Sequence, residues 1–150
     1  MPKRHEALIP LTHDHHHALV QARRLIEAEE AAPEERLAVG REFVTFYEDD
    51  TLLHFHEEEE VLFPALLGHV DEAPPELIRV LLDHVAIHGM VTDLRAALAE
   101  GTVDGALLKR LGETLKAHVR LEETKLFPLI EQAVPDADLS HIEFAERHRG

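Results

Sequence analysis

A repeated stretch that combines a histidine with glutamates most constrains how this chain can fold. It reads His54-Phe-His-Glu-Glu-Glu-Glu-Val-Leu-Phe-Pro64 in its first copy and His118-Val-Arg-Leu-Glu-Glu-Thr-Lys-Leu-Phe-Pro128 in its second. Each copy places a glutamate four residues after its histidine. On a helix, that spacing puts both side chains on one face, about one turn apart. An imidazole and a carboxylate held in this way form half of a metal site.

The composition favours one helical domain. The chain has 150 residues, so we expect a single domain over residues 1–150. Aromatic residues make up only 5%, and Ala and Leu are abundant, which favours helices over sheets. There is no Cys, which excludes thiolate metal sites and disulfides.

The charge and hydropathy of the chain argue against two classes of partner, nucleic acid and membranes. The net charge of -15 argues against nucleic acid, whose phosphates would be repelled. No apolar run is long enough to span a bilayer, so we expect no membrane partner. The first six residues lack the apolar core of a signal peptide, and we therefore expect a cytoplasmic protein.

Helix breakers divide the chain into four long segments. These cover about residues 12–32, 34–67, 75–100 and 104–133, with Thr12 or Asp14 as the expected cap of the first. Each carries an apolar stripe at helical spacing, which includes Leu19 in the first segment, Val61 in the second and Leu81 in the third. The prediction is an all-α, antiparallel, up-down-up-down four-helix bundle. Leu139, Ile142 and Phe144 indicate a short C-terminal helix packed on it.

A second repeat relates the first and third segments. Asp14-His15 in the first matches Asp83-His84 in the third, just as the two His-Glu stretches relate the second and fourth. The sequence therefore predicts a doubled helical hairpin with pseudo-twofold symmetry. Such symmetry tends to bring paired ligands to one central point.

Polar residues interrupt all four stripes where a core is expected. They are His15, His54, Glu58, His84, His88, His118 and Glu122. One such histidine alone would be an ordinary core residue with a hydrogen-bond partner. Together they would cost too much, because a buried uncompensated carboxylate costs several kcal/mol and a domain has only about 5–15 kcal/mol of net stability. Metal ions would convert this cost into ligation energy.

The donor atoms are nitrogen and oxygen only, which limits the metal ions that could bind. Seven ligands exceed the four of a structural zinc site. They suit two metals about 3.5–4 Å apart with bridging carboxylates. A His/Glu site inside a helical bundle favours iron or manganese.

The order of these motifs along the chain resembles the hemerythrin family, and more closely the bacterial hemerythrin-like HHE cation-binding domains. The resemblance spans about residues 11–133 and rests on one His in the first helix, His-x3-Glu in the second and fourth, and His-x3-His in the third. It implies a non-haem di-iron centre. The implied roles are bridging carboxylates for Glu58 and Glu122, one iron capped by His84, His88 and His118, and a second iron with a vacant position held by His15 and His54.

Two assignments stay open at this point. His16 is the alternative to His15 in the first helix. Glu123 is the alternative to Glu122 in the fourth, because classical hemerythrins place an Asp one residue further along.

The expected function is a di-iron protein that binds or senses O2 or NO, by ligand binding rather than turnover. One alternative is a stress protein that reduces NO or peroxide or donates iron. Another is a structural or buffering metal site, for instance one that holds zinc. The expected cofactors are two iron ions, with manganese or zinc as the alternatives to iron. The sequence does not indicate an oligomeric state.

Overall fold

The computed structural model of the protein describes residues 4–144, and every regular element in this range is helical. In chain order the elements are η1 (Glu6–Leu8), α1 (Ile9–Glu27), η2 (Ala28–Glu30), α2 (Pro33–Phe46), η3 (Tyr47–Thr51), α3 (Leu52–Glu57), η4 (Glu58–Leu62), α4 (Phe63–Leu67), α5 (Pro75–Glu100), α6 (Gly105–Leu121), η5 (Glu122–Leu126), α7 (Phe127–Ala133) and α8 (Asp136–Leu139). Of these, η1 and η2 are 3₁₀ turns, whereas η3, η4 and η5 are π-helical turns.

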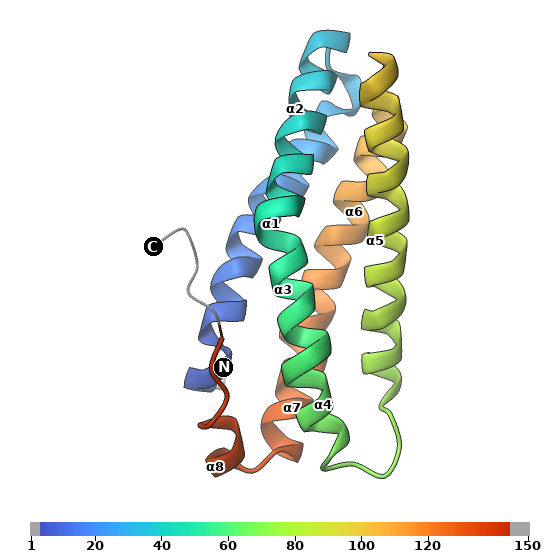
Figure 1. The fold of residues 1–150 in the computed structure, drawn as a ribbon. Coiled ribbons are helices and arrows are strands. Elements are labelled where there is room, and N and C mark those ends of the chain that lie inside the picture. The colour runs from blue at the N-terminus through green and yellow to red at the C-terminus, as the bar shows by residue number, and fades with distance from the viewer. Residues whose placement is uncertain (1–3, 145–150) are drawn as a thin grey trace.

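These elements join into four antiparallel rods, which confirms the expected helical bundle (Figure 1). The first rod is α1 and the third is α5. The second runs without a break from α2 through α4, and the fourth from α6 through α7. A short C-terminal helix, α8, is present and buries Leu139 at the end of the bundle. It ends at Leu139, so the predicted positions Ile142 and Phe144 lie beyond the helix, although both pack against the same cluster.

The first rod begins earlier than predicted. Helix α1 starts at Ile9, with Pro10 in its first turn, so Thr12 and Asp14 lie inside the helix and do not cap it. Proline fits the first turn because the amide groups there have no partner within the helix. The side chain of Asp14 instead contacts His54 of the second rod, as described below.

The π turns explain how two prolines lie within continuous rods. Pro64 follows η4 and Pro128 follows η5. A proline inside a regular α-helix removes one hydrogen bond and clashes with the preceding turn. In the wider turns, the amide of Phe63 donates to the carbonyl of Glu58, and that of Phe127 donates to the carbonyl of Glu122. These two π turns, η4 and η5, therefore begin at the two glutamates that the repeat singled out.

Two glycines let α6 approach the first rod closely. A Cβ at Gly112 would lie 2.7 Å from the carbonyl oxygen of Ala22, and one at Gly105 would lie 2.1 Å from that of Glu29. Any larger residue would push these two rods apart. The contact sets the position of α6, and with it the position of His118.

The apolar core forms two clusters with a polar layer between them. One contains residues such as Leu25, Phe43 and Leu94, and the other residues such as Leu11, Leu66 and Ile130. Three predicted core positions are wrong: Leu19, Val61 and Leu81 are exposed. Val61 lies in a π turn, whose extra residue changes the direction in which the Val61 side chain points. Leu81 lies at the margin of the apolar stripe of α5.

Candidate metal centre

Six of the seven predicted ligands lie in the polar layer between the two clusters. The histidines are His15 on α1, His54 on α3, His84 on α5 and His118 on α6, and the glutamates are Glu58 and Glu122 at the starts of η4 and η5. All six are buried, with exposed fractions of 5% or less. Every rod contributes one imidazole, and the second and fourth rods each add a carboxylate.

The six side chains form two overlapping groups. One contains His15, His54 and both glutamates, and the other contains His84, His118 and the same two glutamates. Within each group the ligand atoms all lie within 4.8 Å of one another. Two carboxylates shared by two pairs of imidazoles have the arrangement of bridging ligands.

The distances show how the glutamates are shared. Oε2 of Glu58 lies 3.2 Å from Nε2 of His54, and its Oε1 lies 3.2 Å from Nε2 of His84. Oε1 of Glu122 lies 2.7 Å from Nε2 of His15 and 3.6 Å from Nε2 of His118. Each carboxylate thus lies between one imidazole of each group.

An outer set of carboxylates faces the other nitrogen of each imidazole. Nδ1 of His54 lies 2.9 Å from Asp14 of α1. Nδ1 of His84 lies 2.6 Å from Glu59, and Nδ1 of His15 lies 2.6 Å from Glu123. Nδ1 of His118 is nearest to Asp83, at 3.5 Å, which is too long for a hydrogen bond. A carboxylate that accepts from Nδ1–H leaves Nε2 free to face the centre.

The electrostatics of the cluster raise the pKa values of three imidazoles and lower the pKa of one glutamate. Burial alone would lower the pKa of His54, but the charge of Glu58 and a hydrogen bond to Asp14 outweigh it and raise the pKa well above 6.5. Burial would also lower the pKa values of His15 and His84, but their glutamate partners outweigh it and raise both values above 6.5. Burial would raise the pKa of Glu122, yet His118 and its hydrogen-bond partners hold it well below 4.5. Protons therefore balance the charge until cations replace them.

His88 is the seventh predicted ligand, and the structure places it outside both groups. It lies one turn after His84 on α5, where its Nδ1 is hydrogen-bonded to the hydroxyl of Tyr47. The ring of Phe55 stacks on His84 with centroids 3.7 Å apart and meets His88 edge-on at 5.6 Å. Phe55 thus borders His88 on the side of His84. Burial, and then the charge of His84, lower the pKa of His88.

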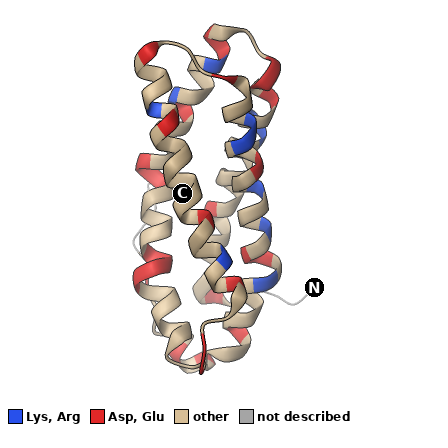
Figure 2. Cartoon of the chain, turned by 90° about the vertical axis from the view of Figure 1, so that its right-hand side faces the viewer, with Lys and Arg blue, Asp and Glu red and all other residues tan. Residues whose placement is uncertain are grey.

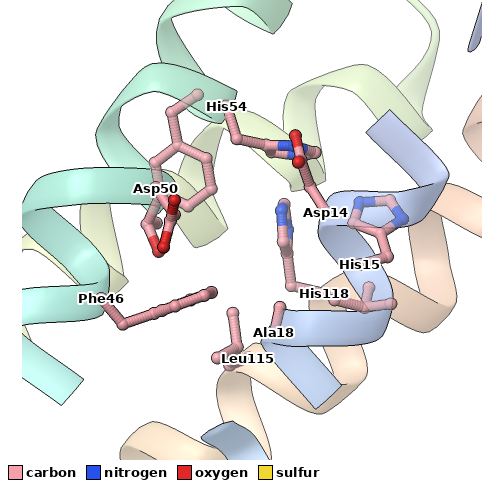
Figure 3. A pocket seen from close by; sticks show the side chains of 11 residues that line it. Asp14, His15, Ala18, Phe46, Asp50, His54, Leu115 and His118 are labelled. Carbon is pink, nitrogen blue, oxygen red and sulfur yellow. The ribbon is translucent and has the colours of Figure 1, made fainter. Parts of the chain in front are cut away.

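A small cavity adjoins the group that contains His15 and His54. Its volume is about 20 Å³. Figure 3 shows the imidazoles of His15, His54 and His118 on one side of it, with Phe46 and Asp50 on the other. Ala18 and Leu115 complete an otherwise largely apolar wall. A space of this size holds about one water molecule or one diatomic molecule.

The comparisons with known proteins agree with this geometry. The family model described as hemerythrin HHE cation binding domain matches residues 7–130. The chain belongs to the hemerythrin HHE family. Comparisons with curated proteins and with solved structures found no match. The family establishes a metal-binding protein, and the buried His and Glu groups are the residues that could hold the metal.

The residues of this hemerythrin domain fit a cation well. Among the described residues, several buried atoms that face the centre have no hydrogen-bond partner: Nε2 of His54, His84 and His118, both carboxylate oxygens of Glu58 and Oε2 of Glu122. Leaving such atoms unpaired costs about 1–3 kcal/mol each, and more for charged groups. Cations coordinated by these atoms would remove that cost.

The structure distinguishes between the alternatives that the sequence leaves open. His15 is buried and faces the centre of this hemerythrin domain, whereas His16 is exposed. Glu122 belongs to both ligand groups, whereas Glu123 lies outside them and contacts His15 from behind.

The outer carboxylates were not among the predicted site residues, apart from Glu123 as an alternative ligand. Their signal is present in the repeats, because an acidic residue precedes His15 and His84 and follows Glu58 and Glu122. A search for acidic residues next to each expected ligand would have found these four residues. Within residues 4–144, no helix combines the length and the apolar character needed to cross a membrane.

Proposed function

We propose that this hemerythrin domain holds two iron ions and binds a diatomic ligand, O2 or NO, at the ion between His15 and His54. The second ion would lie between His84 and His118, and Glu58 and Glu122 would bridge the two. This proposal uses the six clustered residues and leaves His88 outside the ligand set. Reduced iron would supply the electrons and the open coordination position that such ligands require.

The observation that carries the proposal is the cavity of about 20 Å³ beside His15 and His54. The cavity lies nearer to the first group, because both of its histidines, His15 and His54, line the space. Of the two histidines in the second group, only His118 does so. Its apolar lining by Ala18, Phe46 and Leu115 would limit the access of water. A vacant position beside a space for one small molecule is the arrangement that ligand binding needs.

The test is to mix the reduced, iron-loaded protein with O2 or NO and to record the visible spectrum. We expect a rapid stoichiometric change that reverses when the gas is removed. Ala18→Leu should fill the cavity and weaken ligand binding without lowering the iron content. Ala38→Leu, on the exposed face of α2, is the matched control. An absent optical change, or an unaltered response in Ala18→Leu, would contradict the proposal.

A second candidate function is the reduction of peroxide or NO. This function is favoured by two polar residues, Asp50 and Thr51, which also line the cavity. A carboxyl group there could deliver a proton to a bound ligand. Steady consumption of peroxide or NO with a reductant present, reduced in Asp50→Asn, would support turnover. A strictly stoichiometric reaction would support binding alone.

A further inference from the structure

The outer face of α5 carries an unusual concentration of exposed apolar side chains. Ile78 is 50% exposed, Leu82 is 61% exposed and Val85 is 67% exposed. These residues recur at the spacing of one helical face. With Leu81, Ala86 and Gly89, which are also exposed, they form what we call the outer stripe. The metal centre does not use it, because His84 faces the opposite side of the same helix.

The outer stripe contains no charged residue, although the chain has a net charge of -15. Figure 2, which views the molecule from the side of α5, shows an uncharged stretch in the middle of this helix. Two copies of such an acidic protein repel each other over most of their surface. The outer stripe is a surface through which they could approach without bringing like charges together.

We propose that the outer stripe is a self-association surface that pairs with α5 of a second copy, antiparallel and around a twofold axis. An interface of this kind uses the same residues twice, because each contact is repeated by the symmetry. With the axis between Val85 and Ala86, residues whose numbers add up to about 171 face each other.

This register matches a protruding side chain with an open space. Leu82 faces the partner's Gly89, and the symmetry repeats the contact. A Cβ at Gly89 would meet nothing within 4 Å, so the surface above it is free to receive a leucine side chain. The small residues Ala86, at the crossing point, and Gly89, one turn away, also let the two helices approach closely.

The same register matches charges at the ends of the outer stripe. Arg79 comes within one residue of the position opposite the partner's Asp93, because their numbers add up to 172. The side chain of Arg79 is 71% exposed, and its Nε lies 3.2 Å from Asp83 of the same helix. Asp93 is exposed and forms no ion pair with any described residue. Arg79 can therefore contact the partner's Asp93, which lacks a counterion in the single chain.

The size of the contact predicts a weak dimer. Stable complexes bury about 1,600 Å² in total, which is more than one helix packed on one helix provides. We therefore expect a concentration-dependent equilibrium between one chain and two. The metal centres are not shared between the copies, so metal content should not depend on the dimer.

The experiment is analytical ultracentrifugation of the metal-loaded protein over a wide concentration range. The mass should rise from 17.0 kDa towards twice that value. Leu82→Glu should weaken association by about tenfold or more, because it buries a charge. The matched control is Leu67→Glu on α4, which is 46% exposed and lies outside the outer stripe. Circular dichroism and metal content verify that each variant is folded.

A charge exchange tests the register independently. Arg79→Asp and Asp93→Arg should each weaken association, and the double variant should restore it. A wild-type mass of 17.0 kDa at every concentration would overturn the proposal. Equal effects of Leu82→Glu and Leu67→Glu would also overturn it, since the copies would then meet elsewhere. Failure of the double variant to recover would contradict the antiparallel register.

Discussion

Asp14 of α1 accepts a hydrogen bond from Nδ1 of His54 of α3, at 2.9 Å. The same relationship continues around the bundle. Glu59 of the second rod accepts from His84 of the third, and Glu123 of the fourth rod accepts from His15 of the first. Asp83 of the third rod faces His118 of the fourth at 3.5 Å. Each rod thus places a carboxylate beside the imidazole of the next, and three of these four carboxylates accept a hydrogen bond from it.

This outer set of carboxylates should control metal affinity. Glu59→Ala should weaken metal binding by about 10–100-fold, because the imidazole of His84 loses the group that holds its orientation. Glu60→Ala is the matched control, because Glu60 is exposed and pairs with His56. The measurement is competition with a chelator of known affinity. Equal affinities in the two variants would show that the outer carboxylates do not position the ligands.

Symmetry made much of this centre predictable. The two His-x3-Glu stretches and the matching Asp14-His15 and Asp83-His84 pairs are visible in the sequence, and they indicated the bundle and all six clustered residues. Helical spacing identifies a face, but it does not report which neighbour fills the space beside it. His88 has the right spacing from His84, yet Phe55 and Tyr47 border it, and both come from another rod.

The alanine variants of these two histidines should therefore differ. His84→Ala should lose about half of the bound metal, because it removes a ligand from one of the two groups. His88→Ala should keep the metal content and lose only the contact with Tyr47. Elemental analysis of the purified variants measures this. A loss in His88→Ala equal to that in His84→Ala would mean that the imidazole of His88 reaches the metal.

The metal-free protein should become less stable as the pH rises. The pKa values of His15, His54 and His84 are raised above 6.5 in the folded chain, so the folded state holds more protons than the unfolded state above that pH. The stability that these protons provide is complete below about pH 6.5 and is lost as the pH rises through the folded-state pKa values. The lowered pKa of His88 works in the opposite direction, but it is one group against three.

Metal binding should show the reverse dependence, because ligating imidazoles must be neutral. Its affinity should rise over the same pH range and vanish as the solution becomes acidic. Thermal unfolding of the metal-free and metal-loaded forms between about pH 6 and 9 measures both effects. Parallel curves for the two forms would contradict the idea that protons and cations compete for the centre.

Two glycines in helices should respond oppositely to the same substitution. Gly112→Ala should destabilise the fold by about 1–3 kcal/mol, since its Cβ would lie 2.7 Å from the carbonyl oxygen of Ala22. Gly89→Ala should stabilise it by roughly 0.5–1 kcal/mol, because Gly89 is exposed and a methyl group there meets nothing. Denaturant unfolding at low protein concentration compares them. Similar stabilities would mean that the first and fourth rods are less closely packed than described.

The most direct test of the centre is the metal content of the protein from iron-fed cells, compared with that of the double variant Glu58→Ala, Glu122→Ala. We predict two iron ions per chain, about 3.5–4 Å apart by X-ray absorption, and almost none in the double variant, because both glutamates belong to both ligand groups. Iron retained by the double variant, or a wild-type protein that binds no metal, would contradict the account.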